Sequence, residues 1–165
     1  MQHPCVNLRA RRGVTLVDLT LTVLILGIVA AAAAPRFSSA LLFYQVDAAT
    51  RRIEADINYV RTYARFTNQA CSLTFSATAP TYTSTGVPHT NNSGRAYDVD
   101  LAALGYPVTV LANFDGGRSV TFNPSGNPQV GSPLVGLTSG AITVSSGVQT
   151  RTIIIDAVTG KARRS

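Results

Sequence analysis

The sequence predicts an α+β protein: one long N-terminal helix, membrane-spanning in its first half, leads into a small head of antiparallel strands, an open sheet or a sandwich. Residues 14–34 form an apolar run, residues 46–64 repeat apolar side chains at helical spacing, and the chain after residue 68 alternates with the period of strands. Its 165 residues suit about one domain. We expect four parts: a basic, cleavable leader (1–13), a transmembrane helix (14–34), its amphipathic continuation (35–68) and a β-rich extracytoplasmic head (69–165).

The composition favours short strands joined by turns in the second half of the chain. Only 13% of all residues are charged, Trp is absent, and Gly, Pro, Ser and Thr are frequent after residue 70. The formal charge of +6 falls to +3 without the three arginines that precede the apolar run. That remainder nearly equals the C-terminal cluster of Lys161, Arg163 and Arg164, so the whole-chain charge is weak evidence for a nucleic-acid partner.

The apolar run from Val14 to Ala34 is long enough to cross a membrane. It has 21 residues with one charge, Asp18, and a hydrocarbon core about 30 Å thick needs roughly 20 helical residues. Three arginines precede the run, whereas Arg36 alone follows it closely. This asymmetry predicts a single-pass protein of the cytoplasmic (inner) membrane, with a cytoplasmic N-terminus and a periplasmic or other extracytoplasmic head.

An ordinary secretory signal is the alternative interpretation of this segment. It also has a basic start and an apolar middle, and the alanines at 30–34 could supply a cleavage site. However, the run exceeds the roughly 7–15 apolar residues of such signals. It also carries an acid in its first turns and continues into a helical pattern, which favours a retained anchor.

Asp18 requires a physical explanation. Toward the membrane interior a carboxylate costs about 2.5–3.5 kcal/mol on insertion scales, and less near an end. Thr15 and Asp18 have the spacing of a capping box, and an acid in the first turn meets the positive end of the helix dipole. Part of the cost is therefore offset without any partner.

The sequence RRGVTLVD at residues 11–18, followed by an unbroken apolar helix, resembles the leader junction of type IV prepilins and type II secretion pseudopilins. The resemblance implies that a prepilin peptidase cuts between Gly13 and Val14 and methylates Val14. Cleavage at this point would leave Asp18 as the acidic fifth residue of the mature chain. We expect Asp18 to form an assembly salt bridge with the N-terminal amine of a neighbouring subunit. Pro35 stands where many members carry a helix-softening proline, whereas Val14 and Asp18 replace the usual Phe and Glu.

Past a kink expected at Pro35, the helix should continue to about Phe66. Its apolar residues recur at steps of three and four: Val46, Ala49, Ile53, Ile57, Val60 and Ala64. This stripe should pack on a sheet. A polar stripe lies about 120° away: Arg51, Glu54, Asn58, Arg61 and Arg65. We expect it to support the helix, as the spacing of Asp47 and Arg51 does, or to contact other subunits.

Six short segments after the helix read as strands: Cys71–Phe75, Tyr82–Thr85, Val108–Leu111, Val120–Phe122, Ile142–Ser145 and Thr152–Ile155. Turns are expected at 115–117 (DGG) and 123–126 (NPSG), whose residues suit positive φ angles or a fixed proline φ. The polar stretch from Gly86 to Tyr106 is expected to be a surface loop with a short helix at Asp100–Leu104.

The C-terminal half resembles the GspH/FimT group of minor pseudopilins and pilins, in residues 120–126, 142–144, 151–155 and 160–161. The resemblance implies a structural pseudopilin of a type II secretion system, assembled into the periplasmic pseudopilus that drives protein export. Its partners would be prepilin peptidase, an inner-membrane assembly platform, membrane lipid and other pilin or pseudopilin subunits. The alternative is a minor type IV pilin, FimT-like, that binds DNA for natural transformation.

The last six residues resemble a short basic motif associated with DNA capture in FimT-like pilins. Lys161, Arg163 and Arg164 are the candidate DNA-binding residues, with Lys161 where the motif has arginine. Because chain ends are commonly charged and disordered, a solvated tail is the simpler interpretation.

The sequence does not predict an enzyme, a cofactor or a metal site. After leader removal His89 would be the single histidine, which leaves no histidine cluster. Asp98 and Asp100 lack the ligand density and glycine placement of an EF-hand loop. No glycine-rich strand-to-helix junction offers a phosphate site. Cys71 is expected to be a small buried residue.

Cleavage between Gly13 and Val14 is the first testable prediction. Glycine has no side chain at the cut site, and the apolar helix begins directly after it. Intact-mass measurement or N-terminal sequencing of membrane-extracted protein should find a methylated Val14 at the start. A start near Pro35 would instead indicate a secretory signal peptidase and would contradict the pilin interpretation.

Overall fold

The computed structural model describes residues 15–89 and 92–165, and within these ranges the side chains of all residues except 33–36, 38 and 92–95. The chain divides into two compact units, one ending at Ser39 and the other, the head unit, spanning Ala40–Ser165. A single helix, α1 (Leu16–Thr67), contributes residues to both units.

The C-terminal end of α1 is set by a left-handed residue. Asn68 has a φ of 54°, which asparagine tolerates better than most residues. The Gln69 N–H then donates to the Ala64 carbonyl oxygen at 3.2 Å. The helix therefore ends at Thr67, close to the predicted end.

In the part of the chain whose side chains are described, no helix has the length and apolarity of a membrane span. The predicted transmembrane segment, residues 14–34, extends at both ends into residues outside that part. The membrane anchor and the kink at Pro35 therefore stay predictions.

The predicted apolar stripe of α1 is confirmed. All six residues are buried, with at most 2% of their surface exposed: Val46, Ala49, Ile53, Ile57, Val60 and Ala64. Burying a valine or isoleucine side chain, of which this stripe has four, stabilises a fold by about 1.5–3 kcal/mol relative to leaving it exposed. This stripe is therefore the main attachment of the helix to the strands of the head unit.

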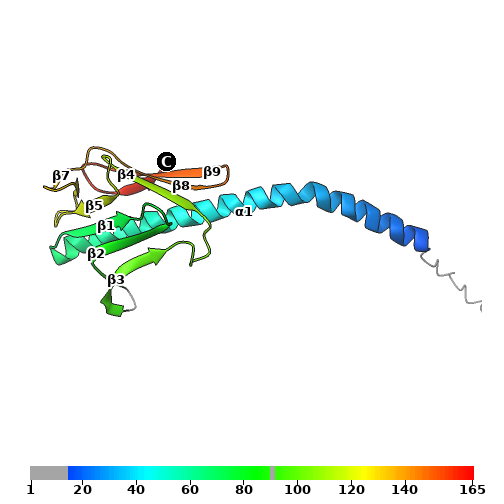
Figure 1. Cartoon of the computed structure of the whole chain (residues 1–165), viewed down its shortest axis with the longest axis horizontal. Coiled ribbons are helices and arrows are strands. Elements are labelled where there is room, and N and C mark those ends of the chain that lie inside the picture. The colour runs from blue at the N-terminus through cyan, green and yellow to red at the C-terminus, as the bar shows by residue number, and fades with distance from the viewer. Residues whose placement is uncertain (1–14, 90–91) are drawn as a thin grey trace, which may run out of the picture. The chain divides into compact units, whose positions relative to one another are not determined.

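Two antiparallel sheets accompany the C-terminal half of α1 (Figure 1). Sheet A has the order β3-β2-β1-β5-β6-β7, and sheet B has the order β10-β9-β8-β4. The strand bounds are β1 Cys71–Phe75, β2 Thr81–His89, β3 Asn92–Asp100, β4 Thr109–Phe114, β5 Ser119–Phe122, β6 Pro128–Val130, β7 Val135–Gly136, β8 Gly140–Ser146, β9 Gln149–Ile155 and β10 Ala162–Arg164. The α+β class expected from the sequence is confirmed.

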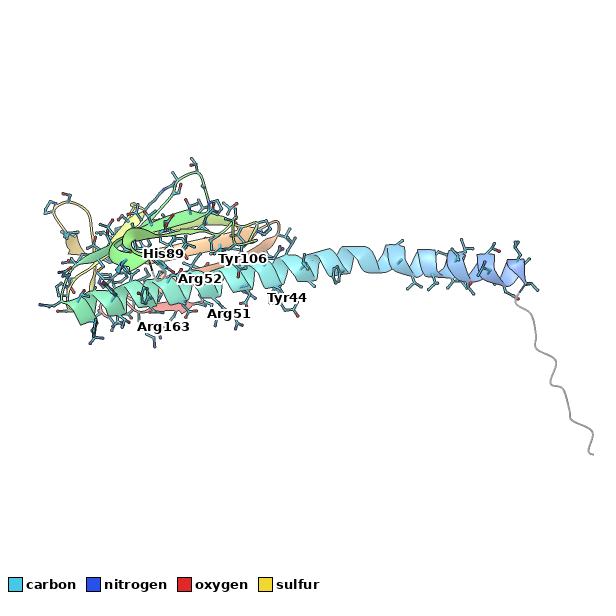
Figure 2. The ribbon with its side chains drawn as sticks, turned by 90° about the horizontal axis from the view of Figure 1, so that it is seen from below. Tyr44, Arg51, Arg52, His89, Tyr106 and Arg163 are labelled. Carbon is cyan, nitrogen blue, oxygen red and sulfur yellow. The ribbon has the colours of Figure 1, made fainter. Side chains whose placement is uncertain are left out.

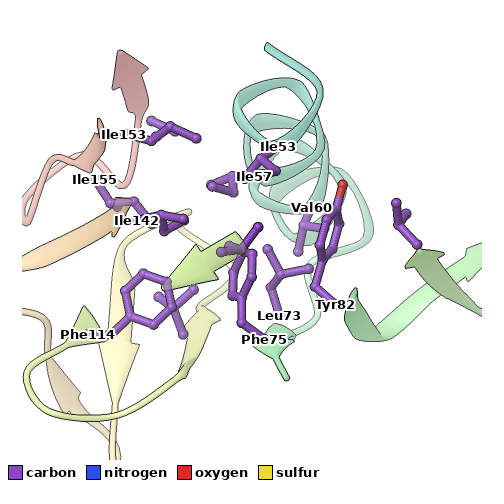
Figure 3. Close-up of a cluster of buried hydrophobic side chains, with 14 of the residues drawn as sticks. Ile53, Ile57, Val60, Leu73, Phe75, Tyr82, Phe114, Ile142, Ile153 and Ile155 are labelled. Atoms are coloured by element: carbon purple, nitrogen blue, oxygen red, sulfur yellow. The ribbon is translucent and has the colours of Figure 1, made fainter. Parts of the chain in front are cut away.

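The core lies where the helix stripe meets inward-facing residues of both sheets (Figure 3). Ile53 and Ile57 point from α1 toward the strands. Phe75 of sheet A and Phe114 of sheet B have ring centroids 5.9 Å apart, so an aromatic pair joins the two sheets. Phe75 also lies 5.2 Å from the Tyr82 ring on β2. The helix and both sheets therefore share one core.

The prediction of a surface loop from Gly86 to Tyr106 is wrong. Strand β2 extends to His89, and β3 occupies residues 92–100. Tyr97 and Val99 of β3 are buried, whereas Asp98 and Asp100 are exposed. Gly86 and Pro88 lie in β2, and neither residue type is typical of a strand, so the sequence did not indicate this strand pair. The pairing of β2 with β3 accommodates both residues through a register shift between Ser84 and Pro88.

The short helix predicted at Asp100–Leu104 is also wrong. The segment forms a turn in which the Asp100 carboxylate accepts hydrogen bonds from the N–H groups of Ala102 (2.9 Å) and Ala103 (3.2 Å). Strands β6, β7 and β10, with two or three residues each, were not predicted, because so few residues show no periodicity.

Gly160, in the loop between β9 and β10, offers a test of how closely that loop packs. It has a φ of 69°, and a Cβ atom there would lie 2.5 Å from the Gly126 carbonyl oxygen and 3.1 Å from the Phe122 ring. Gly160→Ala should therefore lower the free energy of unfolding by more than the about 1–2 kcal/mol of a left-handed L-residue alone.

Gly105→Ala is the matched control, because Gly105 has a φ of 85° with no heavy atom within 4 Å of the added Cβ. Urea unfolding of both variants measures the difference. Equal losses would show that the loop moves away from Gly126 without cost.

Candidate functional site

The predicted cleavage residues Gly13 and Val14 lie outside the described residues, so their role stays a prediction. Asp18 is described and exposed. Its carboxylate accepts hydrogen bonds from the Thr15 N–H (3.2 Å) and hydroxyl (2.8 Å), and the Asp18 N–H donates to Thr15 Oγ1 (3.2 Å). The predicted capping box is therefore confirmed. The salt bridge to a neighbouring subunit stays a prediction.

Arg163 and Arg164 are part of a strand and Lys161 directly precedes it, so the interpretation of the chain end as a disordered, solvated tail is wrong. Residues Ala162–Arg164 form β10, which pairs antiparallel with residues 153–155 of β9. The Ser165 N–H also donates to the Thr152 carbonyl oxygen at 2.9 Å. Ala162 is fully buried. The chain end is therefore ordered and has a fixed position on the head unit.

The loop before β10 is closed by Asp156. Its carboxylate accepts hydrogen bonds from the N–H groups of Val158 (3.1 Å) and Thr159 (2.7 Å), and the Gly160 N–H donates to its carbonyl oxygen (2.8 Å). The hydrogen bonds from the Thr159 N–H and hydroxyl hold the pKa of Asp156 below its ordinary value. This turn reverses the chain and directs β10 back along β9.

Two side chains of α1 bind the backbone of this C-terminal segment. Asn58 donates to the Ala162 carbonyl oxygen (3.3 Å) and accepts from the Ala162 N–H (3.2 Å), so it satisfies the free edge of β10. Arg61 Nε donates to the carbonyl oxygens of Thr159 (2.6 Å) and Gly126 (3.3 Å). The helix therefore holds both the loop and the strand.

Arg164 is neutralised by two acids of α1. Its Nε atom lies 2.8 Å from Glu54 Oε2, and its Nη1 atom lies 3.4 Å from Asp47 Oδ1. Asp47 also accepts from Arg51 Nε at 2.8 Å, which confirms the pair predicted four residues apart. Charge on Arg164 is thus engaged within the chain, and little of it is left for a phosphate partner.

All three cations are exposed, but Arg163 is more exposed than Arg164 and is not paired with the acids of α1 that hold Arg164. The Arg163 side chain is 70% exposed and has one distant carboxylate, with 3.8 Å between its Nη2 atom and Asp156 Oδ2. It projects beside the helix in Figure 2. The structure therefore distinguishes Arg164, which is paired with two acids of α1, from the other two candidate DNA-binding residues, Lys161 and Arg163.

The C-terminal segment binds to the polar stripe of α1. Glu54, Asn58 and Arg61 of the stripe bind residues about 100 positions later in the chain. Periodicity identifies such a stripe, but it cannot show what covers it. Neither expected role, helix support or subunit contact, anticipated this one.

A second polar cluster lies between α1 and sheet A, with Asp56, Tyr82 and Tyr97 buried and Arg52 exposed, and the sequence did not indicate it. Asp56, 6% exposed, accepts hydrogen bonds from Arg52 Nε (3.0 Å) and the Tyr82 hydroxyl (2.5 Å). Arg52 Nη2 donates to the Tyr97 hydroxyl oxygen (2.8 Å). All four side chains thus have partners, which makes a buried carboxylate tolerable in the core.

Burial and the nearby Asp56 charge shift the two tyrosines of this cluster. They raise the pKa of Tyr97 to about 12 and raise the pKa of Tyr82 well above its ordinary value. Both phenols therefore remain neutral donors at physiological pH, which suits a structural cluster that joins β2 and β3 to the helix.

Groups that could carry out chemistry are sparse in the described part of the chain. Among its residues, no three or more His, Cys, Asp or Glu side chains gather as metal ligands. Cys71 is buried, as expected, and burial raises the pKa of its thiol.

An open groove of about 930 Å³ is lined by residues that include Phe114, Asp115, Arg118 and Val135. Asp115 there accepts hydrogen bonds from the Thr138 and Ser139 N–H groups at 2.7 and 2.8 Å. The Asp115 carboxylate is therefore already hydrogen-bonded to the backbone of the head unit.

Comparison with known proteins places the head among pilin-like folds. Residues 49–159, about two thirds of the chain, match the family described as type II transport protein GspH. Two crystal structures of the type IV minor pilin FimU of Pseudomonas aeruginosa have a similar fold. The first has a TM-score of 0.55 at 16% identity and covers 74% of this chain and 89% of that chain. The second has a TM-score of 0.53 at 17% identity and covers 72% and 91%. No curated protein matches the sequence.

The buried tyrosines predict how stability depends on alkaline pH. In the unfolded chain tyrosine has a pKa of about 10, so between pH 10 and 12 the unfolded state loses protons that the folded state keeps. The free energy of unfolding should therefore fall as pH rises through this range, by up to about 1.4 kcal/mol per pH unit for each tyrosine.

Urea unfolding at several pH values measures this slope. Tyr82→Phe and Tyr97→Phe should each flatten it, whereas Tyr44→Phe, at a side chain that is 70% exposed, is the matched control. A wild-type stability that does not change from pH 10 to 12 would contradict the assignment.

Proposed function

The chain belongs to the GspH family of pilin-like proteins, and from this we propose that it is a minor pseudopilin of a type II secretion system. In this proposal prepilin peptidase removes residues 1–13 and methylates Val14. The apolar part of α1 anchors the subunit in the cytoplasmic membrane, with its head in the periplasm. The inner-membrane assembly platform then adds it to a pseudopilus made with other subunits.

The observation that carries this proposal is the exposure of the N-terminal part of α1. Ten large apolar side chains occur between Leu16 and Val29, and each is at least 52% exposed. So large an apolar surface does not stay in water. Lipid before assembly and the helices of neighbouring subunits after assembly would both cover it, as a subunit that moves from membrane to filament requires.

The attachment of the head to its helix supports the same role. The apolar stripe, the cluster around Asp56 and the C-terminal strand all fix the head unit on the helical residues from Val46 to Ala64. A head joined in three ways to these helical residues would move together with them. Displacement of the helix during filament growth would therefore be transmitted to the head surface.

Asp18 provides the test of assembly. In a strain that lacks the gene, Asp18→Ala should be inserted and processed but should enter pseudopili poorly, because the amine of the neighbouring subunit would lose its carboxylate partner in an apolar environment. Secretion of the system's substrates should fall with it, while DNA uptake remains. Pseudopili recovered by shearing, secreted protein and transformation frequency are the three measurements.

Two control variants separate pairing from capping. Asp18→Glu keeps the charge and should restore assembly, whereas Thr15→Ala removes the capping hydroxyl and leaves the carboxylate. Normal assembly of Asp18→Ala would show that capping is the sole role of this acid. Loss of transformation with intact secretion would instead favour a type IV pilin.

A minor type IV pilin that binds DNA is the second candidate function. The observation in its favour is that Arg163 in β10 and Lys161, directly before that strand, are exposed and lie on an ordered segment. Because Arg164 is paired with Glu54 and Asp47, it would contribute little to a phosphate contact. Binding through such cations would be independent of DNA sequence and strongly dependent on salt.

Three alanine variants test this alternative in the purified protein. Lys161→Ala and Arg163→Ala should each weaken duplex binding and reduce the slope of log K against log salt by up to about 0.9. Arg164→Ala, the matched control, should leave that slope nearly unchanged. Equal affinity of all the variants, or no binding by the wild type at low salt, would remove this candidate.

A further inference from the structure

A group of exposed apolar and aromatic side chains lies where the chain enters the head unit. We call Leu41, Phe43, Tyr44, Val148 and Arg151 the proximal rim. Tyr44 is 70% exposed and projects from α1 (Figure 2), and Val148, in the turn between β8 and β9, is 88% exposed. An exposed valine in a turn contributes nothing to the core, so these side chains require another role.

Tertiary structure brings the two parts of the rim together, although about 100 residues separate them in the chain. The Arg151 guanidinium carbon lies 4.9 Å from the centroid of the Phe43 ring. A Cβ atom added to Gly147 would lie 3.5 Å from Leu42 Cδ1. Figure 1 shows the β8–β9 hairpin alongside α1. The hairpin and the first turns of the helix within the head unit therefore form one surface.

The chemistry of this surface is that of a membrane–water interface. The Phe43 and Tyr44 rings meet edge to face, with centroids 5.8 Å apart. Tyrosine combines an apolar ring with a polar hydroxyl, and arginine combines an apolar stem with a charged head that reaches water. Both side chains are suited to the level of lipid headgroups, where aromatic residues are enriched.

The charge of the rim identifies the kind of lipid. Residues 40–46 and 145–151 contain no acidic residue, and Arg151 is their single charge. The nearest acid along the helix, Asp47, is engaged by Arg51 and Arg164. The surface is therefore positive as well as apolar, which matches an anionic bilayer surface.

We propose that the proximal rim rests on the anionic surface of the membrane before the subunit is assembled. This inference rests on the proposed function, because the chain that directly precedes the head unit is the apolar segment proposed as its anchor. An anchored head is held near the bilayer at high effective concentration, so a small contact suffices to orient it. The contact fixes which side of the head unit faces the membrane.

Tryptophan fluorescence provides a direct test, because the chain contains no Trp. Full-length protein carrying Val148→Trp is reconstituted into vesicles of phosphatidylethanolamine and phosphatidylglycerol. Val158→Trp is the matched control: it is also an exposed valine in a turn, 77% exposed, but in the loop between β9 and β10. Neither change disturbs the core.

The proposal predicts that the emission of the Val148→Trp variant shifts to shorter wavelength in vesicles and loses most of its intensity with lipids brominated on the acyl chain. Emission of the control should stay that of a solvent-exposed indole and remain quenchable by acrylamide. Adding Arg151→Gln to the Val148→Trp variant should weaken the bromine quenching. Solvent-like emission from position 148 would overturn the inference that the apolar side chains of the rim contact the bilayer. Bromine quenching that is unaffected by the loss of Arg151 would overturn the electrostatic part of the inference.

Flotation of the same vesicles separates this inference from the proposed function. Protein that floats with the vesicles and has solvent-like emission at position 148 retains its anchor, and only the rim contact is then wrong. Protein that fails to float has no anchor. In that case the proposed membrane location and the rim contact are both wrong.

Discussion

The burial of one stripe of α1 against both sheets is the constraint on which the rest of the head unit depends. Six side chains from Val46 to Ala64 form this stripe, and all are essentially inaccessible to solvent. Neither sheet can cover its inner face alone, and the Phe75–Phe114 contact joins them beside the helix. Because protein interiors are packed as tightly as organic crystals, this common core fixes the position of each element that touches it.

Once the apolar stripe is buried, the polar stripe of the same helix becomes a binding surface within the chain. Asn58 completes the hydrogen bonding of the β10 edge, and Arg164 meets two carboxylates of the helix. Exposed ion pairs of this kind contribute only about 0–1 kcal/mol. These contacts set the direction of the C-terminal strand and leave Lys161 and Arg163 outside the ion pairs with α1.

The two parts of α1 place opposite demands on their surroundings. The part in the head unit satisfies its apolar residues within the chain, whereas the residues from Leu16 to Val29 leave theirs exposed. A single subunit therefore covers the apolar residues of its head unit but leaves those of the N-terminal part of α1 uncovered. This difference is the observation on which the proposed passage from lipid into a filament rests.

The sequence by itself determined the features that depend on local patterns of residue type and spacing. These are the buried stripe of α1, the end of the helix near Phe66, the first strand at Cys71–Phe75, the turn at Asp115 and the Thr15–Asp18 capping box. It also determined membership in the GspH family. Only the tertiary structure decided what joins distant parts of the chain: β3 across a register shift, the cluster around Asp56, and the docking of β10 on the helix. The contacts of Asp56 with β2 and of β10 with the helix unite residues separated by about 26 to 117 positions. The free energies of all these contacts depend on burial and hydrogen-bond geometry, which no local pattern records.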